Sequence, residues 1–232
     1  MKLISRITAL IITLAILLSF TACKELGAIK NLADIASNAE AVAEDWQKYE
    51  EAISKLTNYK IVIESVDEYD NKSVMTEMRC DDGYAIITDG GITFVDFAQN
   101  KMYILSPDDK SGWVYDNADA DAYKGFGLAM YGYLYTFEAF KLLGAKKDGS
   151  DKISGRKTTV YTYSADGSDW KFWTDDEYGL TMKYEKKSSG DSAYMEVTEF
   201  KTSGVKLSDM VNLGEYEIQD LSDFGNFGDF GD

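Results

Sequence analysis

From Tyr59 onward the sequence consists of short segments in which apolar and polar residues alternate, and turns rich in Gly, Asp, Asn and Ser separate them. Alternation with a period of two is typical of strands with one buried face, as at Tyr59, Ile61 and Ile63. Short connections favour antiparallel pairing of neighbours. The pattern predicts an antiparallel sheet of ten or eleven strands. The predicted strands are YKIVIESVDEY, SVMTEMRC, GYAIIT, GITFVDF, KMYILS, GWVYD, GRKTTVYTYS, DWKFWTD, GLTMKYEKK, SAYMEVTEF and EYEIQDL.

The second predicted strand carries the only cysteine that the strand region contains. Met78 and Cys80 share one face of SVMTEMRC, and Glu77 and Arg79 lie on the opposite face. A cysteine on an apolar strand face behaves as a small hydrophobe. We therefore expect Cys80 to be a buried, inert thiol.

The region before the strands, residues 24–58, has a helical period. Its apolar residues recur in steps of three and four, which places them on one stripe of a helix. A coiled-coil seam and an amphipathic helix lying on the sheet are both compatible with the stripe. The second interpretation is favoured, because small alanines make a poor zipper. The stripe consists of Ile35, Ala39, Val42, Trp46, Tyr49, Ile53 and Leu56.

Residues 116–144 interrupt the strand pattern with a segment that is apolar on nearly every side. Acidic residues at its start and Gly144 at its end are typical helix boundaries. A helix of this composition cannot face water on any side. Two interpretations remain open: a plain core helix, or a helical lid over an apolar cavity.

These elements predict an α+β fold with one dominant sheet, which curls under the twist of so many strands. The last segment, residues 222–232, repeats Phe-Gly every three residues and is acidic. Such a composition is typical of a disordered tail. The sequence therefore predicts one folded domain over residues 59–221, preceded by the helix and followed by the tail.

The N-terminus has the pattern of an export signal. Lys2 and Arg6 precede 14 largely apolar residues, too few to span a bilayer comfortably as a helix, which takes ~20. Phe20-Thr21-Ala22-Cys23 resembles the bacterial lipobox, in which the thiol is acylated and the chain is cut just before it. We expect residues 1–22 to be removed, residues 23–58 to form a lipid-anchored helix, and Cys23 to hold the protein on a membrane of the bacterial envelope.

Composition excludes several classes of function. Without residues 1–22 the chain has 22 basic and 40 acidic residues, a net charge of −18, which repels nucleic acid and anionic lipid head groups. The absence of histidine removes the commonest general base and metal ligand. Carboxylate pairs such as Asp175-Asp176 are expected in solvated turns. No catalytic residue, metal site or cofactor is predicted, and the protein is expected not to be an enzyme.

The order of elements resembles the LolA/LolB-like lipoprotein-carrier superfamily. The similarity extends over about residues 39–221 and is most specific in residues 154–187, where a β-branched and aromatic strand precedes Trp-x-Asp, a glycine turn and a strand ending near a lysine. The later stretch YMEVTEFKTSGVKLSDMVNLGEYEI is similar to the family's closing strands. The matching positions are Gly155, Val160, Tyr161, Trp173, Asp175, Gly179, Leu180 and Lys183.

The resemblance implies an incomplete barrel whose concave side is closed by helices, and a cavity for an acyl chain, lipid or lipoprotein. It equally allows an envelope regulator or scaffold with a filled core that acts by protein contact. The family's carriers are soluble, whereas Cys23 implies a fixed protein. Apolar pockets with adaptable methionines suit the first function. Its candidate lining residues are Ile61, Ile63, Met78, Phe94, Met102 and Ile104 from strands, and Met130, Tyr133 and Phe137 from the lid.

Overall fold

The computed structural model describes residues 42, 44–45, 47–116, 140–165 and 167–221. The chain divides into two compact units, which are described separately. The described part of unit 1 comprises residues 42–55 and 140–196, without residues 43, 46 and 166, and residues 67–70. That of unit 2 comprises residues 56–66, 71–116 and 197–221.

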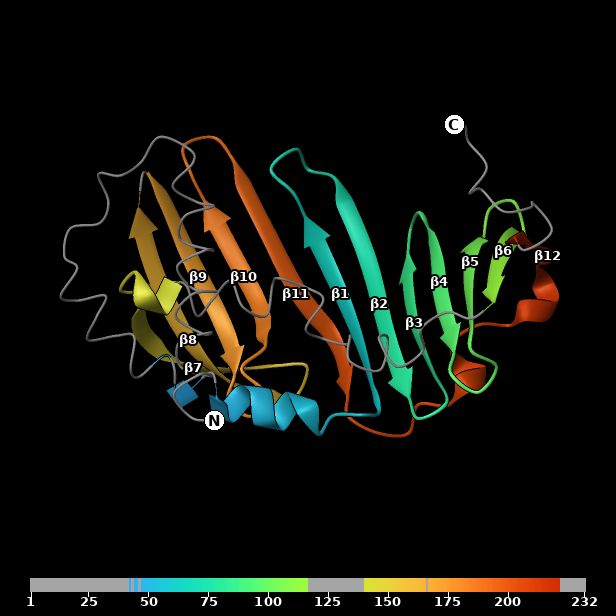
Figure 1. The fold of residues 1–232 in the computed structure, drawn as a ribbon. Helices are drawn as coiled ribbons and strands as arrows, with labels where there is room; N and C mark the ends of the chain where they lie inside the picture. Colours follow the sequence, from blue (N-terminus) through green and yellow to red (C-terminus); the bar gives the residue numbers. More distant parts are fainter. Residues whose placement is uncertain (1–41, 43, 46, 117–139, 166, 222–232) are drawn as a thin grey trace, which may run out of the picture. The chain divides into compact units, whose positions relative to one another are not determined.

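Twelve strands hydrogen-bond in the order β12-β6-β5-β4-β3-β2-β1-β11-β10-β9-β8-β7 (Figure 1). The sheet is open, since β12 and β7 are its two edges, and the predicted α+β fold with an incomplete barrel is confirmed. The strands are β1 (Tyr59–Val66), β2 (Lys72–Cys80), β3 (Gly83–Thr88), β4 (Gly91–Asp96), β5 (Lys101–Ser106), β6 (Ser111–Asp116), β7 (Lys146–Ile153), β8 (Arg156–Ala165), β9 (Ser168–Asp175), β10 (Thr181–Lys187), β11 (Ser192–Lys201) and β12 (Glu217–Asp220).

Two strands differ from the prediction. Strand β7 was not predicted, because KKDGSDKI is charged and is exposed over seven of its eight residues. A register shift between Lys147 and Gly149 marks a bulge in this edge strand, and bulges and charges are common means of protecting a sheet edge. Strand β12 pairs with β6 in parallel, so the sheet is mixed and not wholly antiparallel.

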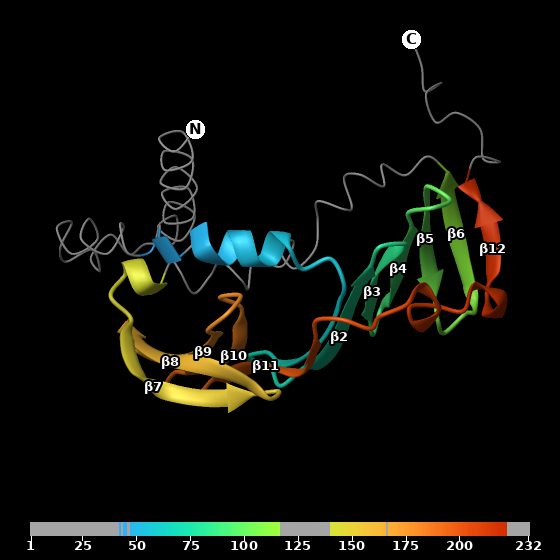
Figure 2. The same cartoon turned by 90° about the horizontal axis from the view of Figure 1, so that it is seen from below.

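Unit 2 has its core on one face of β2–β6. Met78, Ala85, Phe94 and Leu105 are buried there, because successive antiparallel registers place them on the same side of the sheet. The segment after β11 runs alongside β2–β6 (Figure 2) and covers this face with buried Val205 and Met210 and with partly buried apolar side chains. This segment contains two short 3-10 helices, η2 (Leu207–Asp209) and η3 (Leu213–Glu215).

The opposite face of the same strands is also partly buried, although the alternation of apolar and polar residues in the second predicted strand suggested one buried face. Glu77 is completely buried there, although it was placed across the strand from the apolar residues Met78 and Cys80. Cys80 is buried as predicted, and burial raises the pKa of its thiol. Strand β2 therefore buries both faces near its end.

Unit 1 combines the first helix with the strand block of the family resemblance. Residues 47–54 are helical, as are Val42, Glu44 and Asp45, so the prediction of a helix holds over this range. Gly179, at φ +68°, lies so close to the Tyr49 ring that a Cβ atom would collide with it. The helix is thus held against the turn between β9 and β10, which agrees with an amphipathic helix packed on the strands.

Asp175 fixes that turn. Its carboxylate accepts hydrogen bonds from the backbone N–H groups of Glu177 (3.0 Å) and Tyr178 (2.7 Å) and from the Arg156 guanidinium (2.5 Å). The Asp175 side chain is buried, so the prediction of a solvated carboxylate is wrong at this position. The Trp-x-Asp block therefore supplies a buried ion pair at the start of the glycine turn.

Candidate functional site

The most distinctive surface of unit 1 is an aromatic face formed by three adjacent strands. Tyr161 of β8 pairs with Phe172 of β9, which pairs with Tyr184 of β10, and in the next row Tyr163 pairs with Trp170. Directly paired residues point to the same side of an antiparallel sheet. We call this set of five residues the aromatic face. Of its members, Phe172 alone is fully buried and the other four are partly exposed.

Phe140 packs on the aromatic face from outside the sheet. It belongs to a short helical stretch at residues 140–142. Its ring centroid lies 4.7 Å from that of Phe172, 5.3 Å from Tyr163 and 5.4 Å from Trp170. Trp170 and Phe172 stack in parallel at 5.8 Å. These separations are in the range that aromatic pairs favour.

Lys141 lies beside the same face. Its ammonium is 5.3 Å from the centre of the Tyr161 ring and 5.8 Å from that of Tyr49. It also forms an ion pair of 2.9 Å with Asp45 of the helix. The Lys141 side chain is only 10% exposed, whereas that of Asp45 is 45% exposed. A charged nitrogen is thus held at the margin of an apolar surface.

Unit 2 has an open apolar patch on the face opposite its core. Ile104 of β5 pairs with Trp113 of β6, and Met102 pairs with Tyr115. Met102 is half-buried, whereas Ile104, Trp113 and Tyr115 are 36%, 45% and 37% exposed. We call these four residues the open apolar patch. Exposed clusters of large apolar side chains are typical of interaction sites.

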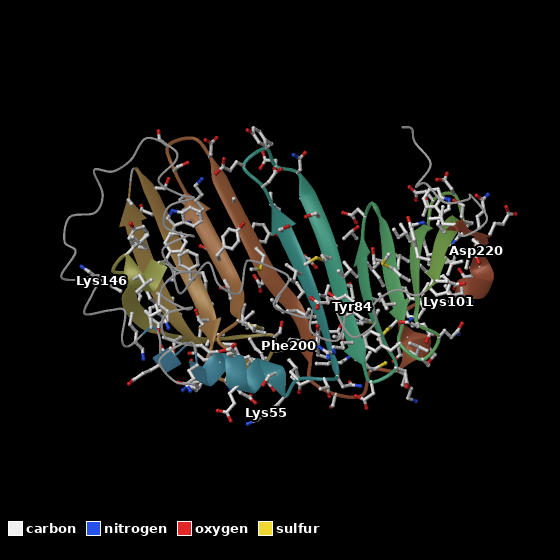
Figure 3. The ribbon with its side chains drawn as sticks, viewed as in Figure 1. Lys55, Tyr84, Lys101, Lys146, Phe200 and Asp220 are labelled. Atoms are coloured by element: carbon white, nitrogen blue, oxygen red, sulfur yellow. The ribbon has the colours of Figure 1, made fainter. Side chains whose placement is uncertain are left out.

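A buried carboxyl lies on the same side of unit 2 as the open apolar patch. Glu77 accepts a 2.5 Å hydrogen bond from the Tyr59 hydroxyl. Tyr84, labelled in Figure 3, is also buried. Burial raises the pKa of the Glu77 carboxyl to about 7, and hydrogen bonds from Tyr59 and Tyr84 and the charge of Arg79 oppose this rise.

The six strand residues predicted to line a cavity do not share one surface. Ile61, Ile63, Met102 and Ile104 lie on the face of unit 2 that carries Glu77. Met78 and Phe94 lie on the opposite face, in the core beneath the segment after β11.

The remaining predicted site residues, Met130, Tyr133 and Phe137 of the lid and Cys23 of the anchor, lie outside the described residues. The same is true of most of the predicted lid and of the tail. The aromatic face itself was missed as a site. The alternation of aromatic residues in GRKTTVYTYS and DWKFWTD could have indicated it.

Met78 contributes to a small cavity of unit 2, with a volume of about 180 Å³, between β1, β2 and the segment after β11. Lys60, Lys201 and Asp209 also line it. Glu199 binds the two lysines at 2.7 Å and 2.5 Å, so their charges are already compensated. A cavity of this size and polarity does not suit an acyl chain.

Two further observations concern the part of the chain that the structure describes. No set of three or more Cys, Asp or Glu side chains there is grouped so that it could bind a metal ion. None of the helices in these ranges has both the length and the apolar character needed to cross a bilayer.

Comparisons with known proteins give structural neighbours only. No family model and no curated protein matches the sequence. A chain of the MucA/MucB complex of Pseudomonas aeruginosa is similar at a TM-score of 0.38 and 11% identity, over 75% of this chain and 63% of that one. The lipoprotein LppX of Mycobacterium tuberculosis is similar at 0.38 and 11%, over 72% and 98%. An uncharacterized conserved protein of Thermus thermophilus is similar at 0.41 and 7%, over 76% and 99%. At these scores the likeness carries no information on ligand or partner.

Proposed function

We propose that the protein is a lipoprotein of the bacterial cell envelope that binds the apolar chain of a lipid or lipoprotein on its aromatic face. The observation that carries the proposal is the set of partly exposed rings at Tyr161, Tyr163, Trp170 and Tyr184, which line one side of three adjacent strands. Aromatic side chains offer large apolar contact areas of ~150–250 Å² each. Covering them with a hydrocarbon chain removes both surfaces from water, at ~25 cal/mol per Å².

The sequence of the N-terminus supports the proposed location. The export pattern and Cys23 support an extracytoplasmic protein that acyl chains hold on a membrane. The resemblance to lipoprotein carriers implies the same class of ligand. A fixed position favours receiving or holding an apolar ligand at one membrane over carrying it between membranes.

Binding is a better account of this chain than catalysis. The sequence contains no histidine, so the most common general base is absent. The buried carboxylate Asp175 is engaged by Arg156 and by two backbone N–H groups, and its role is to hold a turn. These facts support a function that does not depend on a reacting group.

A charge placed on the aromatic face tests the proposal. Tyr184→Asp puts a carboxylate beside Phe172 and Trp170, and it should lower the amount of co-purifying lipid about tenfold, because a charge resists desolvation. The measurement is lipid extraction of the purified protein followed by mass spectrometry.

Tyr194→Asp is the matched control for this experiment. Tyr194 pairs with Glu185 on the neighbouring strand, so it points to the opposite side of the sheet from Tyr184. The control should retain the lipid content of the wild type. Equal lipid in Tyr184→Asp and the wild type, or no lipid in the wild type, contradicts the proposal.

The open apolar patch favours a second candidate function, contact with another envelope protein. Trp113 and Tyr115 are the kinds of side chain that dominate protein interfaces. A photo-crosslinking residue at position 113 should capture one partner in cells. The same residue at the exposed position of Tyr69 should not capture it. Identical capture from both positions would rule out a specific contact at the patch.

A further inference from the structure

We propose that Lys141 selects an apolar ligand that ends in a single anionic head group, a carboxylate or a phosphate. This inference rests on the proposed binding at the aromatic face and adds the chemical class of the ligand. Its basis is the position of the Lys141 ammonium, which lies 5.3 Å from the Tyr161 ring, a member of that face.

The Lys141 side chain is largely buried. An ammonium with a side chain that is 10% exposed loses most of its hydration, and it needs a negative partner in compensation. Two tyrosine rings supply part of this through their negative faces. The carboxylate of Asp45, 2.9 Å away, supplies a full negative charge.

Asp45, the partner of Lys141 in the ion pair, is open to solvent. Its side chain is 45% exposed, so it can return to water at small cost and leave its place to another anion. A carboxylate or phosphate oxygen of a ligand would replace it with the same charge and the same kind of hydrogen bond. The exchange leaves Lys141 compensated throughout.

Lys141 lies next to the rings of the aromatic face. Phe140, the preceding residue, packs on Phe172, Tyr163 and Trp170, and the ammonium of Lys141 lies 5.3 Å from the ring of Tyr161 on the same face. A ligand whose head group binds Lys141 can lay its chain along these rings. A neutral apolar molecule would gain the ring contacts alone.

Matched ligands test the inference on the purified and delipidated protein. Dodecanoate and dodecanol have the same chain length and differ in the charge of the head group. By calorimetry at pH 8, the wild type should bind dodecanoate about tenfold more tightly than dodecanol, as one charge-assisted hydrogen bond implies. Dodecyl phosphate distinguishes the two candidate head groups. If the protein binds it more tightly than dodecanoate, the preferred head group is a phosphate, and if it binds it more weakly, the preferred head group is a carboxylate.

Variants assign the preference to Lys141. Lys141→Gln should bring the two affinities within about twofold, mainly by weakening dodecanoate, and Lys141→Arg should keep part of the preference. Asp45→Asn should tighten dodecanoate several-fold, because it removes the competing carboxylate. A purely structural role for the ion pair predicts no such opposite effects.

Lys171→Gln is the matched control, because Lys171 also lies over an aromatic ring, that of Trp173 at 5.2 Å, but on the opposite side of the sheet. It should leave both affinities unchanged.

Equal binding of dodecanoate and dodecanol by the wild type overturns the inference and leaves the proposed function standing. Lys186 lies 5.3 Å from the Trp170 ring, and loss of the preference in Lys186→Gln instead of Lys141→Gln also overturns the inference. If neither ligand binds, the proposed function itself fails.

Discussion

Glu77 is a completely buried carboxyl, although acidic side chains are almost never fully buried unless they are paired. Its pKa is about 7 in the folded protein against an ordinary value of 4.5. The folded state therefore holds the proton more tightly than the unfolded state does. Stability from this group is fully present below pH 4.5 and is lost as the pH rises to about 7.

Glu77→Gln should remove this pH dependence. Its amide can still accept the hydrogen bond from Tyr59, and it carries no charge at any pH. Between pH 5 and pH 8 the wild type should lose ~2–3 kcal/mol of unfolding free energy that the variant retains. Urea unfolding at both pH values measures the difference, and parallel pH profiles for the two proteins would contradict the assignment.

Gly179 gives a second prediction for a single residue. Gly179→Ala should destabilise the protein by ~1–3 kcal/mol more than Gly155→Ala, because the new methyl group must displace the Tyr49 ring. Gly155 is a matched control, since its φ of +77° is close to the +68° of Gly179 and nothing lies near its missing Cβ. Thermal unfolding measures both changes. If the two variants are equally stable, the contact with Tyr49 is unimportant.

At the scale of elements, the sequence predicted the strands that alternate and missed β7, which does not. The alternation in Tyr59, Ile61 and Ile63 indicated β1, and the hairpin turn after it indicated its pairing with β2. The polar sequence of β7 has no such period, and its pairing with β8 alone defines it as a strand. The parallel pairing of β12 depends on the path of the segment after β11, which no local pattern records.

The segment after β11 is the element that closes the core of unit 2. Met210, buried at the end of η2, packs on that core. Met210→Ala should lower the unfolding free energy by ~2–4 kcal/mol, because the cavity that it leaves cannot fully collapse. Leu213→Ala, at a partly buried position of the same segment, should cost less than half as much. Urea midpoints compare the two, and equal effects would mean that the segment is only loosely packed.

At the scale of the whole molecule, the pairing of strands joined by short turns was predictable, but the pairings between distant strands and the candidate site were not. Regular turns and alternating residues indicate that consecutive strands pair within β1–β6 and within β8–β11, but they do not indicate the pairing of β1 with β11 or of β6 with β12. The six strand residues chosen for a cavity were separated onto two faces, because a strand pattern alone does not tell which face a later segment will cover. The aromatic face is defined by the registers of β8, β9 and β10, and these appear only when the strands are paired.

At the same scale, we predict that the protein is attached to a membrane through one atom, the sulfur of Cys23. Without residues 1–22 the chain has a net charge of −18, which repels anionic lipid head groups, so no other part of the surface should hold the protein there. Each buried methylene of an acyl chain contributes ~0.8 kcal/mol, and several chains make the attachment stable. Cys23→Ser should therefore move the protein from the membrane pellet to the soluble fraction of the envelope. Cys80→Ser, a change at the buried thiol, should leave it in the pellet. Persistence of Cys23→Ser in the pellet after a high-salt wash would show that something other than the acylated cysteine anchors the protein.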